Sequence, residues 1–293
     1  MFRDRFAPSP NGLLHLGHAY SALTVWEGVL RNHGEFILRL EDIDTARSRS
    51  EFEEAIFEDL EWLDLEWSTP AMRQSDRLDI YWQAISQLDS LGVCYPCSCT
   101  RADIRNALAA PQESQPSLHG QQPDAGPYPG LCRNRPMSTL SENDAIRLDM
   151  LKSIKLLGGF DALNKLHFDE VGESHSGRHH LCASTLLACH GDFVVARKDV
   201  RTSYHLAVVV DDAEQEVSQV TRGEDLFGAT AVHRLLYEIL ELRVPVWNHH
   251  RLIRDETGKR LAKSRNSSSI RSLRKSGLKP NDIREMVGIP YDR

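Results

Sequence analysis

The sequence lacks the segments that would export a chain or hold it in a membrane. Its N-terminus has no charged region followed by an apolar run and a small-residue cleavage site, so we expect no secretory signal. The apolar stretch 206–210 is followed at once by Asp211 and Asp212, and nothing approaches the length of a membrane-spanning helix. We therefore expect a cytoplasmic protein.

Net positive charge is also missing, since 42 acidic residues outnumber 35 lysines and arginines and give a formal charge of −7. If this charge were spread evenly, it would argue against a nucleic-acid partner. However, residues 251–284 carry eleven basic side chains against three acidic ones, which gives +8 there and −15 elsewhere. Such a segment is either a solvated tail or a basic face for a phosphate ligand such as ATP or RNA.

Cysteine is scarce, and the six residues lie at positions 94, 97, 99, 132, 182 and 189. In a secreted protein they could pair as disulfides, whereas in a reducing compartment clustered cysteines are more often metal ligands. Cys97, Cys99 and Cys132 would give three soft ligands. A tetrahedral thiolate site needs a fourth, for which Cys94 is the obvious candidate from the residues alone.

The first forty residues predict a strand at 3–7, an amphipathic helix at 18–32 and a buried strand at 35–40. In a right-handed crossover of this kind the ligand site lies at the carboxyl ends of the strands. Residues 110–130 are rich in Pro, Gln, Gly and Ser, which predicts a flexible loop within an insertion. Other segments are expected as helices at 50–63, 75–92 and 226–242, as strands at 145–148 and 247–253, and as β-rich stretches at 192–196 and 204–210.

Residues 5–18 read Arg-Phe-Ala-Pro-Ser-Pro-Asn-Gly-Leu-Leu-His-Leu-Gly-His and predict a nucleotide-phosphate site. A helix N-terminus presents unpaired amides and a positive dipole, a glycine lets the backbone approach a phosphate, and imidazoles donate hydrogen bonds to its oxygens. His15, Gly17 and His18 supply these features. Without their surroundings, the two histidines could equally be turn and helix-cap residues.

A second motif, Lys-Arg-Leu-Ala-Lys-Ser at 259–264, follows near the C-terminus. A lysine on a mobile loop can close over a triphosphate late in a reaction and so stabilise the transition state more than the ground state. Together the two motifs resemble the HIGH and KMSKS signatures of class I aminoacyl-tRNA synthetases. We expect His15, His18 and Lys263 to act in catalysis, and these three with Gly17 to bind ATP. Three positions depart from the pattern of full synthetases without removing a charged participant: Asn11, His18 and Ala262.

An acidic turn follows the second predicted strand, where three carboxylates can hold an ammonium group or can simply form a salt-bridged turn. The run Leu-Arg-Leu-Glu-Asp-Ile-Asp at 38–44, the proline-rich lead before it and Arg-Gly-Glu-Asp-Leu at 222–226 closely resemble the catalytic domain of glutamyl-tRNA synthetases. The resemblance extends from residue 5 to residue 264.

This resemblance implies roles for five side chains. Arg5 and Arg222 would bind the side-chain carboxylate of glutamate, because guanidinium forks suit carboxylates. The α-amino group would lie at Glu41, helped by Ser9 and Tyr204. The alternatives are that Arg222 pairs with a neighbouring aspartate, Asp225, and that Tyr204 is only a half-buried strand residue.

The cysteine region has a resemblance of its own. A Cys-x-Cys pair followed by Tyr-x-x-x-Cys resembles the zinc site of glutamyl-queuosine tRNA(Asp) synthetases, which are short homologues of glutamyl-tRNA synthetases. It implies a structural zinc ion bound by Cys97, Cys99, Tyr128 and Cys132, with Tyr128 in place of Cys94. The loop at 100–127 is longer than is usual in that family, so Cys94 remains an alternative.

A segment rich in histidine and cysteine lies at 172–190. A second metal site is conceivable here, but the segment is polar and has no clean ligand spacing. We expect a loop beside the active site instead. Its candidate ligands are His175, His179, His180, Cys182, Cys189 and His190.

The expected architecture is α/β: a Rossmann-like class I synthetase catalytic domain with a zinc-stapled insertion, a short helical C-terminal region and no anticodon-binding domain. Its expected parts are 1–93 and 191–250 for the two halves of the catalytic domain, 94–190 for the zinc-binding, acceptor-end-like insertion, and 251–293 for the lysine loop and basic helical tail.

The resemblance implies an enzyme that activates L-glutamate with ATP and Mg²⁺ to glutamyl-adenylate. It would pass the glutamate to queuosine in the anticodon loop of tRNA(Asp), with the insertion and the 251–284 segment, including Arg271, Arg274 and Lys275, as candidate RNA contacts. The alternatives are a ligase that charges another tRNA or a small acceptor, and a non-catalytic tRNA-binding paralogue. We expect a monomer.

Overall fold

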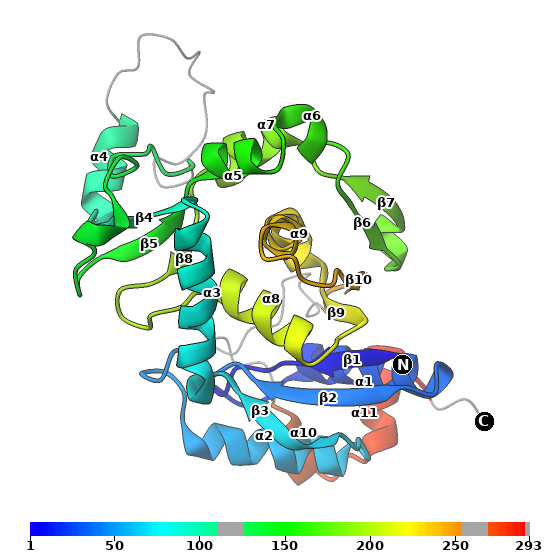
Figure 1. Cartoon of the computed structure of the whole chain (residues 1–293). Helices are drawn as coiled ribbons and strands as arrows, with labels where there is room; N and C mark the ends of the chain where they lie inside the picture. The colour runs from blue at the N-terminus through cyan, green and yellow to red at the C-terminus, as the bar shows by residue number, and fades with distance from the viewer. Residues whose placement is uncertain (110–125, 254–268, 291–293) are drawn as a thin grey trace.

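The computed structural model describes residues 1–109, 126–253 and 269–290 (Figure 1). Its lower layer in that view is a parallel sheet of β1 (Arg3–Phe6), β2 (Glu35–Leu40) and β3 (Ser68–Arg73). Helix α1 (Leu16–Arg31) connects β1 to β2, and α2 (Ser50–Trp62) connects β2 to β3. The predicted strand, helix and strand at the N-terminus are therefore confirmed.

A second sheet has the order β7-β6-β10-β9. Its strands are β6 (His167–Glu170), β7 (Gly177–His180), β9 (Gln219–Gly223) and β10 (Val246–His250). Strand β9 lies beside β1, because the Ser218 amide donates to the Arg3 carbonyl at 2.9 Å. The buried Asp4 carboxylate accepts from the amide and the hydroxyl of Thr221, at 3.1 and 2.6 Å. These contacts join the two sheets, so that the ends of β1 and β9 share one edge.

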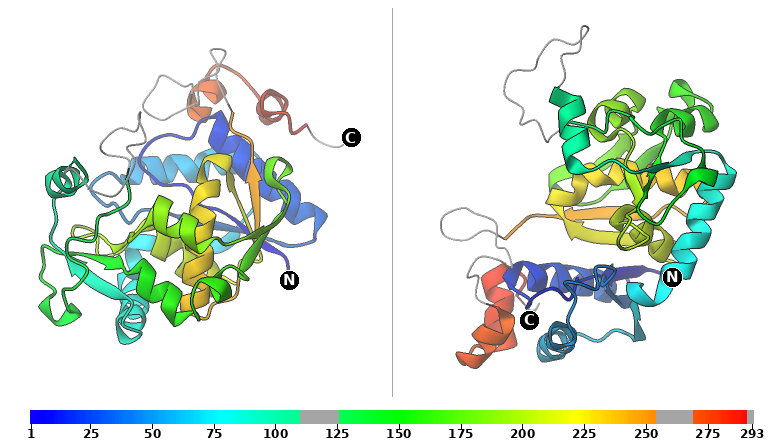
Figure 2. Two further views of the ribbon diagram at one scale, coloured as in Figure 1. Left: turned by 90° about the horizontal axis from the view of Figure 1, so that it is seen from above. Right: turned by 90° about the vertical axis from the view of Figure 1, so that its left-hand side faces the viewer.

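A third, antiparallel sheet of β4 (Cys94–Cys97), β5 (Ala145–Leu148) and β8 (Val194–Ala196) stands away from the first (Figure 2). Helix α3 (Leu78–Ser90) leads to it from the lower layer, and α4 (Arg101–Ala109) follows β4. The strand pairings cross the expected boundary at 190, since β8 pairs with β5 while β6 pairs with β10. Strands from both sides of residue 190 therefore share sheets. The expected division of the chain into catalytic halves, insertion and tail stays a prediction.

The β-rich stretch predicted at 204–210 is wrong, because these residues begin helix α8 (Tyr204–Glu214). Ser203 caps the helix by accepting from the Leu206 amide at 3.4 Å. Leu206, Val208 and Val209 are all buried, so this helix has no polar face whose spacing could reveal it. The helix predicted at 226–242 is divided into a 3₁₀ helix, η5 (Glu224–Ala229), and α9 (Thr230–Ile239).

The C-terminal helices pack under the first sheet. Helix α10 (Ile270–Lys275) lies against α2, and α11 (Pro280–Val287) lies against α1 (Figure 1). The buried Arg284 on α11 pairs with Glu27 on α1 at 2.8 Å. In the described parts of the chain, no helix is long and apolar enough to cross a membrane. The short elements are η1 (Gln74–Arg77), η2 (Met137–Thr139), α5 (Met150–Leu156), α6 (Phe160–Leu163), η3 (Glu173–His175), α7 (Ala183–Thr185) and η4 (Leu186–His190).

Candidate active site and cysteine cluster

A cavity of about 450 Å³ opens where β1, β2, β9 and β10 end and α1 begins. It brings together every predicted ligand-binding side chain of the cleft that the structure describes. These are Arg5, Ser9, His15, Gly17, His18, Glu41, Tyr204 and Arg222. Lys259, Ala262 and Lys263 lie outside the described residues.

The first turn of α1 forms one wall of the cavity. His15 is the N-cap, its Nδ1 accepts from the Gly17 amide at 3.1 Å, and His18 Nδ1 accepts from the His15 amide at 3.1 Å. With Nδ1 used as an acceptor, each neutral ring carries its proton on Nε2, which is a donor suited to a phosphate oxygen. A Cβ on Gly17 would meet His15 Cε1 at 2.9 Å, so only glycine fits under this cap.

The described residues just before and just after 254–268 lie next to this wall. Ile253 lines the cavity, and the Ile270 amide donates to the Leu14 carbonyl at 2.8 Å, next to His15.

Buried ion pairs hold the floor of the cavity. Arg5 Nε donates to Asp212 at 3.0 Å, and its Nη1 donates to the Thr221 carbonyl at 3.0 Å. Arg39, which is fully buried in β2, donates to the same Asp212 at 2.6 Å and to Glu41 at 3.4 Å. Burial raises the pKa of Asp212, but Arg39 and Arg5 outweigh this effect and lower it.

Glu41 stands at the cavity end of this network, with 13% of its side chain exposed. Burial raises its pKa, while Arg39 and Arg5 act to lower it. Tyr204 begins α8 beside it and is not a strand residue, and burial raises the pKa of its phenol. Sequence reasoning missed Arg39 and Asp212. The available signals were an arginine inside a buried strand and two aspartates ending an apolar run.

Arg222 forms the opposite side of the cavity and is 5% exposed. Its nitrogens contact His249 Nε2 at 3.0 Å, His233 Nδ1 at 3.0 Å, Thr230 Oγ1 at 2.8 Å and the Leu226 carbonyl at 3.3 Å. It forms no ion pair with any described residue, and Asp225 is not among its partners. A buried guanidinium without a counter-charge suits an anionic ligand.

The histidine and cysteine segment at 172–190 does not gather into one group. The His175 ring stacks on Phe227 with centroids 3.9 Å apart, and His179 stacks on Phe168 at 5.2 Å. Cys182 and Cys189 are exposed. Hydrogen bonds of Ser184 and Thr185 lower the pKa of the Cys182 thiol to about 7.

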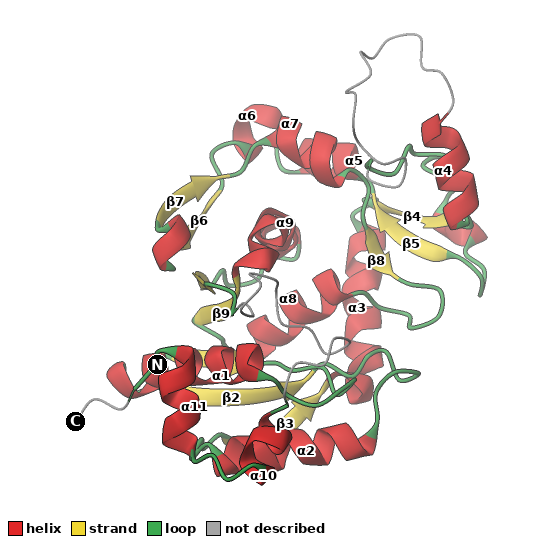
Figure 3. Ribbon diagram, turned by 180° about the vertical axis from the view of Figure 1, so that it is seen from behind, coloured by secondary structure: helices red, strands yellow, loops and turns green. Residues whose placement is uncertain are grey.

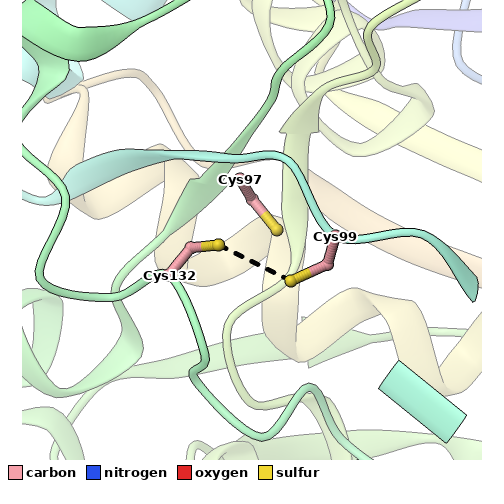
Figure 4. Close-up of side chains that lie close together, drawn as sticks. All are labelled: Cys97, Cys99 and Cys132. Carbon is pink, nitrogen blue, oxygen red and sulfur yellow. Dashed lines mark hydrogen bonds between the residues drawn. The ribbon is translucent and has the colours of Figure 1, made fainter. Parts of the chain in front are cut away.

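Three cysteines do gather at the end of β4. The sulfur atoms of Cys97, Cys99 and Cys132 lie within 4.8 Å of one another, and Figure 4 shows Cys99 and Cys132 in contact at 3.5 Å. The Tyr128 hydroxyl lies among them, at 3.3 Å from Cys97 and 3.2 Å from Cys99. Cys94 is at the other end of β4 in the apolar core, where burial raises its thiol pKa to about 12.

The donor set fits a tetrahedral metal ion, because three sulfurs and one phenol oxygen converge from two chain segments. Arg147 covers this site. Its guanidinium lies 3.8 Å from the centre of the Tyr128 ring, and its Nε donates to Cys97 Sγ at 3.3 Å. A cation in this position stabilises thiolate and phenolate ligands.

Comparison with known proteins gives consistent matches. The family described as tRNA synthetases class I (E and Q), catalytic domain, matches residues 1–125 and 182–289. A glutamyl-Q tRNA(Asp) synthetase from Rhodobacter capsulatus is 45% identical over 97% of this chain and 99% of its own length. A glutamate–tRNA ligase from a Hydrogenobaculum species is 34% identical over 97% of this chain and 57% of its own length.

Solved structures give the same fold. A glutamate tRNA ligase from Elizabethkingia meningosepticum, in complex with its amino acid, has a TM-score of 0.73 and 27% identity. The match covers 98% of this chain and 60% of that one, so the chain spans about three fifths of the solved relative. A methionyl-tRNA synthetase from Mycobacterium tuberculosis, with a TM-score of 0.55 at 12% identity, shares the fold alone.

Proposed function

The chain belongs to the class I glutamyl- and glutaminyl-tRNA synthetase family, among the glutamyl-Q tRNA(Asp) synthetases, and from this premise we propose that it attaches L-glutamate to queuosine in tRNA(Asp). It is an ATP-dependent ligase of the adenylate-forming kind. The finer assignments that follow, namely the amino-acid pose, the nucleic-acid acceptor and the metal, are proposals.

The observation that carries the amino-acid assignment is the charge pattern of the cavity. Arg222 is a buried cation without a carboxylate partner among the described residues, and Arg5 faces the same space. Glutamate would place its side-chain carboxylate against these two guanidinium groups and its ammonium group against Glu41. Ser9 and Tyr204 would complete the site.

ATP would bind at the start of α1. His15 and His18 would donate from Nε2 to phosphate oxygens, Gly17 would allow close backbone approach, and Lys263 would neutralise charge in the transition state. A glutamate α-carboxylate oxygen attacks the α-phosphorus in line, and the bond from phosphorus to the bridging oxygen breaks. Pyrophosphate then leaves, with Mg²⁺ as its counter-ion, and no enzyme nucleophile is needed.

The acceptor assignment is supported by the relatives. In the second step a hydroxyl oxygen of the queuosine cyclopentenediol attacks the carbonyl carbon of the adenylate. The bond from that carbon to the AMP oxygen breaks, and the hydroxyl proton passes to the phosphate of the departing AMP. A relative named for this reaction is 45% identical over 99% of its own length, whereas two of the matched glutamate–tRNA ligases are 34% identical over 57% and 55% of theirs.

We further propose that Cys97, Cys99, Tyr128 and Cys132 bind a structural zinc ion. Cys97 and Cys99 precede residues 110–125, while Tyr128 and Cys132 follow them. A bound ion would link these two parts of the chain and so stabilise the insertion. The RNA contacts expected on the tail stay a prediction. Arg271 and Arg274 both pair with Glu58 on α2, at 2.8 and 3.2 Å. An RNA phosphate would have to compete with this carboxylate.

The test is transfer of radiolabelled glutamate to purified tRNAs. We expect labelling of tRNA(Asp) that carries queuosine, and none of queuosine-free tRNA(Asp) or of tRNA(Glu). Labelling of tRNA(Glu), or of a small amine alone, would establish the alternative ligase. Absence of labelling together with tRNA binding would establish the non-catalytic paralogue. Light scattering in the same buffer tests the expected monomer.

A further inference from the structure

The second layer around Arg222 is built from imidazoles. Two of its partners are ring nitrogens, His249 Nε2 and His233 Nδ1, each at 3.0 Å. Both rings are almost fully buried, at 1% and 2% exposure. They come from β10, which pairs with β9 in the sheet, and from α9, which lies above β9 in Figure 3. The guanidinium is therefore held by two separate elements.

The hydrogen-bond partners of the two rings determine which of their nitrogens carry a proton. Arginine only donates, so the facing atoms His249 Nε2 and His233 Nδ1 must be acceptors. His249 keeps its proton on Nδ1, 2.5 Å from Glu170 Oε2, and His233 keeps its proton on Nε2, 3.0 Å from His205 Nδ1. Burial lowers the pKa of each of the two rings, and Arg222 lowers it further. Both imidazoles are therefore neutral.

Glu170 contacts the His249 ring on the side away from Arg222. Glu170 accepts from the His249 amide at 2.8 Å and from the Gly172 amide at 2.6 Å, and it meets the His249 ring instead of the guanidinium. Arg5, in contrast, contacts the Asp212 carboxylate directly at 3.0 Å. Arg5 thus has a carboxylate partner, while Arg222 is oriented by neutral acceptors and pairs with no carboxylate among the described residues.

We infer that His233 and His249 are positioning residues that select an acidic over an amide side chain by fixing Arg222 without neutralising it. The inference rests on the proposed function, in which Arg222 meets the substrate side chain. A glutamate carboxylate supplies the missing counter-charge and accepts charge-assisted hydrogen bonds. A glutamine amide is neutral and leaves the buried guanidinium uncompensated, which is the kind of mismatch that discriminates strongly between similar substrates.

The experiment compares His233→Asn with His233→Asp. The two side chains have nearly the same shape, and each places an oxygen near the position of Nδ1, but only aspartate adds a negative charge. The readout is amino-acid-dependent exchange of pyrophosphate into ATP, with KM and kcat measured separately for glutamate and glutamine. Circular dichroism and thermal unfolding of each variant report the fold.

With His233→Asn we expect the KM for glutamate to stay within about 5-fold of the parent value, because a neutral acceptor is retained. With His233→Asp we expect that KM to rise by about 30-fold with a smaller change in kcat, and the preference for glutamate over glutamine to fall by at least about 10-fold. Equal defects in both variants, or an Asp variant with unchanged preference, would overturn the inference.

A second pair covers the case in which His233→Asp does not fold. Thr230 contacts Arg222 Nη2 from another side, and Thr230→Asn against Thr230→Asp repeats the same comparison of charge. If the parent protein shows no glutamate-dependent exchange, the proposed function fails. If the parent is active but the charge contrast is absent in the pair that folds, only this inference fails.

Discussion

The cavity and the cysteine cluster, defined here as Cys97, Cys99, Cys132 and Tyr128, are held in place in different ways. In the cavity, Arg5, Asp212 and Arg39 satisfy one another through buried charge-assisted hydrogen bonds of 2.6 to 3.0 Å. In the cluster, three thiols and one phenol meet through weak sulfur hydrogen bonds of 3.2 to 3.5 Å, and the Cys132 amide donates to the Tyr128 hydroxyl at 2.9 Å. Thiols are weak donors and acceptors, so the sulfur contacts contribute little to holding the cluster together.

This difference shows which site depends on its ligand. The cavity keeps its geometry because the protein supplies the partners of Arg5, while Arg222 forms no ion pair with any described residue. The cluster would gain most of its stability from a metal ion. Damage to one region should therefore leave the other largely intact, and the following changes test that independence.

The largest effect is expected from Arg222→Leu, which removes a buried cation that pairs with no carboxylate among the described residues. We expect kcat/KM for glutamate in pyrophosphate exchange to fall by about 1,000-fold, because the substrate carboxylate would be buried without its partner. Arg222→Lys keeps the positive charge but not the forked guanidinium, so its kcat/KM should lie between those of the parent protein and Arg222→Leu. Metal content should not change. A Leu variant that retained a tenth of the activity would disprove the role of Arg222.

Asp212→Asn breaks the network of the cavity by taking the shared carboxylate from Arg5 and Arg39. We expect the free energy of unfolding to fall by about 3–5 kcal/mol, since two buried guanidinium groups lose a carboxylate that both of them contact. The control is Asp199→Asn, whose aspartate is 58% exposed and pairs with Arg197. That change should cost less than about 1 kcal/mol. Equal costs in urea unfolding would contradict the account of the cavity.

Cys132→Ala removes one ligand from the cluster, and Cys189→Ala is the matched control because Cys189 is exposed and outside it. We expect zinc content to fall from about one ion per chain to near zero in the first variant only. Thermal unfolding should begin several degrees lower, while tRNA-independent exchange with glutamate stays within about 3-fold of the parent. Loss of exchange on the same scale as in Arg222→Leu would show that the two regions are coupled.

Arg147→Leu tests the cation beside the cluster. We expect zinc affinity to fall by about 10-fold, measured by competition with a chromophoric chelator, because Cys97 loses a charge-assisted donor. Arg147→Lys should retain part of this affinity. An unchanged affinity in the Leu variant would mean that Arg147 only packs on Tyr128.

A buried carboxylate away from both regions gives the smallest expected effect. Asp59 on α2 has no hydrogen-bond partner in the described structure, and burial raises its pKa from 3.8 to about 6. The native state then binds the proton more tightly than the unfolded chain, so the protonated form stabilises at low pH and this stability is lost as pH rises through 6. The gain from Asp59→Asn should grow by about 1–2 kcal/mol between pH 4.5 and pH 7.5. A pH-independent difference would contradict this assignment.

Most of the elements that line the cavity can be predicted from the sequence, because the motif residues lie at the ends of strands. Strands β1 and β2 and the start of α1 follow from apolar runs bounded by proline and glycine. Helix α8 does not, since a helix buried on all sides leaves no polar periodicity. His233, His249 and Glu170 could not be predicted either, because their importance comes from three-dimensional contacts: the two rings contact Arg222, and Glu170 contacts His249.

In the cysteine cluster, too, the sequence alone does not decide which residues come together, although these residues are closer in sequence. The sequence leaves Cys94 and Tyr128 as alternatives, because both lie near the Cys-x-Cys pair. The strand direction of β4 separates them, since Cys94 pairs with Leu148 at one end and Cys97 with Ala145 at the other. Three-dimensional placement therefore brings Tyr128 to the sulfurs.

The most direct test of the account is exchange of labelled pyrophosphate into ATP by the parent protein without any tRNA. We expect exchange that depends on glutamate, that glutamine does not support, and that Arg222→Leu lowers by about 1,000-fold. Exchange supported equally by glutamine, or none with glutamate, would contradict the claim that this cavity activates an acidic amino acid.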